Sequence, residues 1–132
     1  MLRFLLSAIV SFAASPSQAQ PKEEAVQQEI VPPYLYKVIS KENWKQSQSA
    51  KSLALSLDDQ AFIHFSKEDQ LERITAKYWS SVPEYMLLKI STAKLPGKLV
   101  FEANPGGTSK YYHLYEGSIP LEAIVESKII KN

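Results

Sequence analysis

The segment from Ala61 to Trp79 constrains the fold most, because it combines the patterns of a strand, a turn and a helix. It reads AFIHFSKEDQLERITAKYW. The first five residues are apolar or aromatic except for one histidine, which is typical of a mostly buried strand. Successive side chains of a strand point to opposite faces. The two predicted faces are Ala61, Ile63 and Phe65 on one side and Phe62, His64 and Ser66 on the other.

The residues after this strand carry the signals of a helix start. Ser66 stands at the N-cap position, where its hydroxyl can accept a backbone N–H, and two acidic residues follow at the positive end of the helix dipole. Apolar residues then recur at helical spacing. They predict a buried stripe of Leu71, Ile74, Tyr78 and Trp79. His64 and Ser66 have two interpretations here, a core histidine with a simple cap or part of an anion site at the helix start. This segment alone favours the first interpretation, a core histidine with a simple cap.

The chain begins with the pattern of a secretory signal peptide. Arg3 precedes an apolar run at residues 4–14, and Ser17 and Ala19 satisfy the small-x-small cleavage rule. The run is shorter than the roughly 20 residues of a membrane-spanning helix. We expect cleavage after Ala19, which gives a secreted or periplasmic protein with no membrane contact afterwards. The alternative is an uncleaved anchor, against which Pro16 argues.

The remaining composition predicts one small domain. Residues 20–33 are polar and proline-containing, as expected of a flexible linker, and residues 34–132 form the domain. Arg3 is one of 15 basic residues, so the chain without residues 1–19 has 14 basic and 14 acidic side chains. This balance gives no electrostatic case for nucleic acid or an anionic membrane. The absence of cysteine excludes disulfides, a lipid-modified cysteine, a thiol nucleophile and thiolate metal ligands.

The pattern of the domain predicts an α+β fold with a mixed or antiparallel sheet. Strands are expected at residues 34–39, 61–65, 84–91, 98–103, 110–117 and 123–130. Helices are expected at residues 41–50, capped by Ser40 and anchored by Trp44, at 67–79, and as a short turn at 92–95. The loop at 51–60 is expected to turn Leu53, Leu55 and Leu57 inward, and the Asn-Pro-Gly-Gly segment at 104–107 is a turn.

Several polar and aromatic residues of these strands are candidates for a site. His64 and His113 both lie in hydrophobic strands, and imidazole serves proton transfer or phosphate binding near neutral pH. Glu102 precedes the glycine-rich turn and can point into a cleft, or it can be a solvated strand carboxylate. The tyrosines of the fifth strand can stack on a planar ligand or pack on one another. They are Tyr111, Tyr112 and Tyr115. No histidine spacing supports a metal site.

Four short motifs resemble the DUF952 family, a small bacterial family of uncharacterised function. They are LYKVI at 35–39, FIHFS at 62–66 followed by Gln70, FEAN at 101–104 and HLYEGSIPLEAI at 113–124. The resemblance covers about residues 34–129. Members of this family look like the split α/β scaffold of ADP-ribosyltransferases, which bind NAD in a cleft between two small sheets. The IHFS motif is similar to the His-x-Ser segment of RNA 2′-phosphotransferases.

The resemblance implies a nucleotide cleft and places residues in it. Lys37 falls near the first-strand position, His64 and Ser66 fall in the second motif, and His113 falls near the third-strand catalytic acid. A histidine cannot supply the negative charge of that acid, and Glu102 can replace it only if the fold brings it close.

Two functions therefore follow. One is a cleft of ADP-ribosyltransferase type that binds a small nucleotide or phosphate ligand, with NAD or a related nucleotide as the implied cofactor. Its catalytic candidates are His64, His113 and Glu102, and its ligand-binding candidates are Lys37, Ser66, Tyr36 and Tyr115. The alternative is a non-catalytic binding or structural module of the cell envelope that retains only the scaffold. The sequence leaves enzymatic activity and oligomeric state open.

Overall fold

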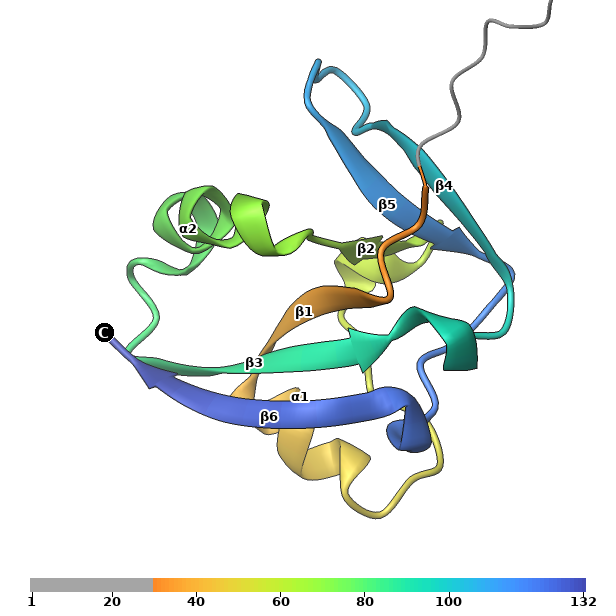
Figure 1. The fold of residues 1–132 in the computed structure, drawn as a ribbon. Helices are drawn as coiled ribbons and strands as arrows, with labels where there is room; N and C mark the ends of the chain where they lie inside the picture. Colours follow the sequence, from red (N-terminus) through yellow and green to blue (C-terminus); the bar gives the residue numbers. More distant parts are fainter. Residues whose placement is uncertain (1–29) are drawn as a thin grey trace, which may run out of the picture.

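The computed structural model describes residues 30–132 as an α+β domain with two separate sheets (Figure 1). The predicted signal peptide and residues 20–29 of the predicted linker lie outside the described residues. The strands are β1 (Tyr34–Ser40), β2 (Ile63–Phe65), β3 (Glu84–Ser91), β4 (Lys98–Ala103), β5 (Lys110–Tyr115) and β6 (Ile124–Lys131). The helices are α1 (Lys41–Ser47) and α2 (Leu71–Ile74). Short 3₁₀ turns lie at Leu57–Asp59, Glu68–Gln70, Thr92–Lys94 and Leu121–Ala123.

Every strand pair is antiparallel, and each sheet has three strands. The first sheet has the order β1-β3-β6 and the second has the order β2-β5-β4, so β3 and β5 are the central strands. The expected α+β class is therefore confirmed, and of the two expected kinds of sheet, mixed or antiparallel, the structure has the antiparallel kind. No helix among residues 30–132 has the length and apolarity needed to cross a membrane.

Period-two alternation of apolar residues determines which strand faces form the core. In β1, Leu35, Lys37 and Ile39 are buried, while Tyr36 and Val38 lie on the other, half-buried face. Most of the buried apolar residues of both sheets belong to one cluster, which Trp44 of α1 also contacts. The cluster consists of Leu35, Ile39, Leu53, Ile63, Phe65, Met86, Leu88, Ile90, Tyr112, Leu114, Ile119 and Ala123.

The two sheets are joined at a single backbone bridge between Tyr36 and Ser66. The Tyr36 N–H donates to the Ser66 carbonyl at 2.8 Å, and the Ser66 N–H donates to the Tyr36 carbonyl at 2.9 Å. This bridge continues β2 by one residue and holds it against the middle of β1.

The bridge corrects the predicted role of Ser66. Because its backbone is paired with Tyr36, Ser66 stays extended, and the helical segment begins later with Lys67 as N-cap residue. The Gln70 side chain accepts the Lys67 N–H at 2.9 Å and donates to the Lys110 carbonyl at 2.8 Å. The start of the helical segment is thus fastened to β5.

The predicted single α-helix at 67–79 is also corrected. The segment is a 3₁₀ turn, then α2, then a π-helical turn at Thr75–Trp79. None of its residues is fully buried, and Tyr78 is 58% exposed. Three of the four residues of the predicted apolar stripe, Ile74, Tyr78 and Trp79, line a cleft rather than the core. Elsewhere, α1 ends at Ser47 rather than near Ala50, and Leu57 is exposed rather than turned inward.

Helix α1 starts as predicted, which gives a matched test of the two serines. The Ser40 hydroxyl accepts the Asn43 N–H at 3.0 Å, whereas the Ser66 hydroxyl makes no hydrogen bond within residues 30–132. We expect Ser40→Ala to lower the free energy of unfolding by about 1 kcal/mol, as loss of an N-cap does. Ser66→Ala is expected to change it by less than about 0.5 kcal/mol. Urea denaturation measures both, and an equal loss in the two variants would contradict the corrected cap assignment.

Candidate functional site

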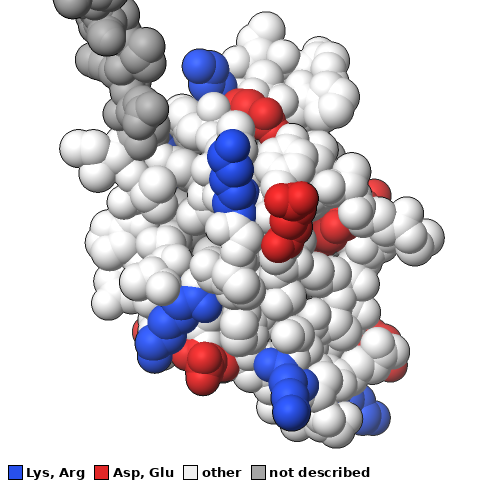
Figure 2. Space-filling view, turned by 90° about the vertical axis from the view of Figure 1, so that its right-hand side faces the viewer, with Lys and Arg blue, Asp and Glu red and all other residues white. Residues whose placement is uncertain are grey.

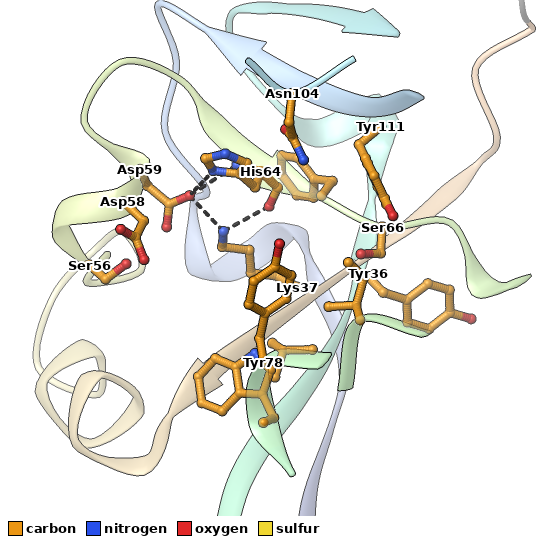
Figure 3. Close-up of a pocket in the computed structure, with 14 residues that line it drawn as sticks. Tyr36, Lys37, Ser56, Asp58, Asp59, His64, Ser66, Tyr78, Asn104 and Tyr111 are labelled. Carbon is orange, nitrogen blue, oxygen red and sulfur yellow. Dashed lines mark hydrogen bonds and ion pairs between the residues drawn. The ribbon is translucent and has the colours of Figure 1, made fainter. Parts of the chain in front are cut away.

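A cleft of about 570 Å³ lies where the two sheets meet, beside the π-helical turn (Figure 3). This volume is within the range of roughly 300–1,000 Å³ typical of small-molecule sites. The lining comes from β1, β2, the loop before β2, the helical segment and the ends of β4 and β5. It consists of Tyr36, Lys37, Val38, Ser56, Asp58, Asp59, His64, Phe65, Ser66, Ile74, Tyr78, Trp79, Asn104 and Tyr111.

The polar end of the cleft is organised by one carboxylate oxygen of Asp59. Asp59 Oδ1 accepts hydrogen bonds from Lys37 Nζ at 2.8 Å and from the His64 backbone N–H at 3.0 Å. The His64 ring nitrogen Nδ1 lies 3.0 Å from the same oxygen. Lys37 Nζ also donates to the His64 carbonyl at 2.7 Å. Figure 3 shows these three residues joined in one network.

Burial and pairing act in opposite directions on the two charges of this network. Burial alone would raise the pKa of Asp59, but hydrogen bonds from His64 and the charge of Lys37 outweigh it and lower this pKa to about 2. Burial lowers the pKa of Lys37, although the Asp59 carboxylate opposes that effect. The side chains are 7% and 5% exposed, so this is a buried ion pair in which each charge compensates the other.

Much of the remaining lining of the cleft is aromatic. Tyr36, Tyr78, Trp79 and Tyr111 line it, and the Trp79 ring also packs on Tyr85 of β3 with a centroid distance of 5.2 Å. The Asn132 side chain donates to the Trp79 carbonyl at 2.7 Å, which ties the end of the π-helical turn to the end of β6. We call these four side chains the aromatic wall; the two contacts hold Trp79 in its place within it.

A second hydrogen-bond network surrounds His113, which packs against His64. His64 and His113 are directly opposed in the pairing of β2 with β5, and their ring centroids are 5.3 Å apart. His113 is fully buried, with Nδ1 2.8 Å from Glu102 Oε2 and Nε2 2.8 Å from Asn104 Oδ1. The Tyr115 hydroxyl donates a hydrogen bond to Glu102 Oε2. Hydrogen bonds from Tyr115 and His113 lower the pKa of Glu102, and burial lowers the pKa of His113.

The structure separates the predicted site residues into two groups. Tyr36, Lys37, His64 and Ser66 line the cleft. His113, Glu102 and Tyr115 do not line it; they form the supporting network, where Phe62 stacks on His113 at a centroid distance of 4.0 Å. His64, with a side chain 37% exposed, is the accessible histidine.

Two functional residues escaped the sequence reasoning. Asp59 lies in the predicted loop, and its only signal was a pair of acidic residues before a histidine-containing strand. Asn104 lies in the predicted turn, where the asparagine was attributed to turn formation. Both become recognisable only when the loop and turn are placed against His64 and His113.

The surface charges of the domain agree with the balanced composition. Figure 2 shows basic and acidic side chains interspersed among uncharged ones, with no broad area of a single sign on that face. Among residues 30–132, no three His, Asp or Glu side chains converge in a way that could hold a metal ion.

Comparisons with known proteins find relatives of the fold but no activity. The profile of a family described as "Protein of unknown function (DUF952)" matches residues 38–127. The X-ray structure of protein CC0527 from Caulobacter crescentus aligns with a TM-score of 0.63 and 24% identity, over 73% of this chain and 84% of that chain. Its solution NMR structure aligns with a TM-score of 0.63 and 25% identity, over 74% and 84%. No curated protein sequence matches the chain.

The Asp59 network predicts how stability depends on pH. The pKa of Asp59 in the folded protein, about 2, lies below the value of about 3.9 that an aspartate has in an unfolded chain. The resulting stabilisation is therefore present above pH 4 and is lost as the pH falls towards 2, by about 2 kcal/mol. We expect Asp59→Asn to remove this part of the pH dependence when unfolding is measured by urea denaturation between pH 2 and 5.

Asp58→Asn is the matched control for this measurement. It removes a neighbouring carboxylate from the same turn without breaking the hydrogen bonds to Lys37 and His64. An identical pH profile for wild type and Asp59→Asn would contradict the assigned role of Asp59.

Proposed function

Since the chain belongs to the DUF952 family of proteins of unknown function, its cleft is the best guide to activity, and we propose that this cleft binds a small nucleotide-like ligand. The observation that carries the proposal is the pairing of an aromatic wall with a polar, buried end inside one cavity of about 570 Å³. Ligand sites of this kind combine apolar surface for a ring with a few polar groups that fix its orientation.

The ligand's planar ring lies between the aromatic side chains of the wall. Stacking of a base on an aromatic side chain contributes about 1–3 kcal/mol per base. Tyr78 is well placed for this contact because it is exposed yet lines the cleft.

The sugar of the ligand lies towards the polar end. Carboxylate oxygens of Asp58 and Asp59 accept hydrogen bonds from hydroxyl groups, and the Ser66 hydroxyl adds a group that can donate or accept. The Lys37 charge is already compensated by Asp59, so a phosphate gains less from it than from a free ammonium group. We therefore place the nucleoside part in the cleft and the phosphate towards its open side.

The split scaffold supports an ADP-ribosyltransferase-like type of site, with NAD and ADP-ribose as the first ligands to test. The resemblance calls for a carboxylate beside the bound ribose. Glu102, the substitute expected from the sequence, binds His113 and Tyr115 and is not part of the cleft lining. This observation favours a second candidate, a binding module of the cell envelope without ADP-ribosyl transfer activity. Binding of NAD without its consumption distinguishes the second candidate from the first.

Export of the protein is a separate proposal that rests on the predicted signal peptide. Fractionation of cells expressing the full chain, followed by N-terminal sequencing, is expected to find the protein outside the cytoplasm with Gln20 as its first residue. A cytoplasmic protein with an intact N-terminus would refute export.

The role of Tyr78 in binding can be tested against a matched tyrosine. Calorimetric titration with NAD, ADP-ribose and AMP is expected to detect binding to the wild type and at least tenfold weaker binding to Tyr78→Ala, which is about 1.4 kcal/mol. Tyr34→Ala should bind like the wild type. Tyr34 is a suitable control because it is also an exposed tyrosine with a lysine over its ring, but it lies outside the cleft lining.

Absence of binding by all three ligands would argue against a nucleotide cleft. Equal weakening in the two variants would place the ligand elsewhere.

A further inference from the structure

The two histidines differ in the hydrogen bonds of their rings. This difference assigns the chemistry of the cleft to His64, an inference that rests on the proposed function of the cleft. We propose that His64 is a general base, oriented by Asp59, that takes a proton from a hydroxyl group of the bound ligand or from water.

Asp59 holds His64 at two points, one on the backbone and one on the ring. Its Oδ1 accepts the His64 backbone N–H at 3.0 Å and lies 3.0 Å from ring Nδ1, so backbone and ring are held by the same oxygen. Lys37 in turn holds that oxygen at 2.8 Å and the His64 carbonyl at 2.7 Å. An aspartate that only shaped the loop would need the backbone contact alone. The additional ring contact is the arrangement that orients an imidazole for proton transfer.

The partner of Nδ1 determines where the lone pair of the neutral ring lies. The ionised Asp59 carboxylate can only accept, so Nδ1 must carry the proton. Neutral imidazole has one N–H, and the lone pair therefore lies on Nε2. Nε2 makes no hydrogen bond within residues 30–132, and the ring lines the cleft with the side chain 37% exposed.

His113 does not meet these conditions. Glu102 and Asn104 contact both of its ring nitrogens at 2.8 Å, and the residue is 0% exposed. Its ring instead meets the edge of His64, and Phe62 packs against both histidines. His113 is thus a positioning residue, which supports the His64 ring through the contact between the two rings.

The step is a proton transfer coupled to bond formation. The hydroxyl or water O–H bond breaks, its proton moves to Nε2, and its electron pair remains on the oxygen. That oxygen forms a bond to an electrophilic centre of the ligand, and the bond from this centre to the leaving group breaks, with the electron pair going to the leaving group. The imidazolium is stabilised by the Asp59 carboxylate until it returns the proton to the leaving group or to solvent. No oxidant or reductant is needed.

The first test is the tautomer of His64, measured by long-range ¹H–¹⁵N NMR of the described domain within the full chain at a pH where the ring is neutral. The expected result is a proton on Nδ1 and none on Nε2. A neutral ring with its proton on Nε2 would overturn the proposal.

The second test is hydrolysis of p-nitrophenyl acetate, a generic probe in which activated water attacks the ester carbonyl and p-nitrophenolate leaves. We expect about tenfold or greater loss of the rate in His64→Gln and in Asp59→Asn, in keeping with the 10²–10⁴-fold usually contributed by a general base. Glu122→Gln, which removes an exposed carboxylate outside the cleft, should retain the wild-type rate. Wild-type hydrolysis no faster than that of His64→Gln would overturn the proposal.

Neither test contains a nucleotide. If no nucleotide binds, the NMR and hydrolysis results still test His64. If those two results are negative, the binding titrations still test the nucleotide cleft, so the two proposals can be refuted separately.

Discussion

The reciprocal backbone hydrogen bonds between Tyr36 and Ser66 are the constraint on which the remaining structure depends. They are the point where a strand of one sheet pairs with a strand of the other, and they fix β2 across the middle of β1. Residues next to the bridge on both strands line the cleft, namely Lys37 and Val38 of β1 and His64 and Phe65 of β2. The cleft is a direct consequence, because its polar lining residues occupy the positions next to the bridge on both strands.

Asp59 adds charge pairing to the junction of the two sheets, because it pairs with Lys37 and His64 there. A buried ammonium group and a buried carboxylate each carry a large desolvation cost, which their mutual attraction and hydrogen bonds must offset. Lys37 and Asp59 meet this requirement together with the His64 backbone. Hydrophobic residues of similar size would stabilise this position at least as well. This buried ion pair lies at the edge of a cleft and contacts a histidine ring. A role in the chemistry of the cleft therefore explains it better than a contribution to stability does.

Local patterns predicted the strands well and the helical segment poorly, for one physical reason. In β1 and most of β3, buried residues alternate with half-buried ones, so the alternation reports which face meets an apolar surface. The helical stripe of Ile74, Tyr78 and Trp79 also reports an apolar surface, but periodicity cannot distinguish a core from the wall of a cleft. The site depended still more on distant contacts. Asp59 and Lys37 are separated by 22 positions, so no local pattern connects them.

The two histidines show how the register of one strand pair can assign different roles to the same side chain. Pairing β2 with β5 places His64 and His113 opposite each other, so they share an aromatic neighbour in Phe62. Their hydrogen-bond partners nevertheless make them unlike, since one ring is enclosed with both nitrogens bound and the other has a nitrogen available to the cleft. Environment rather than residue type decides which group of a pair acts as base. Glu102 is committed to the enclosed ring. The only carboxylate bonded to the accessible histidine within residues 30–132 is Asp59, and this pairing is the reason for proposing His64 as the base.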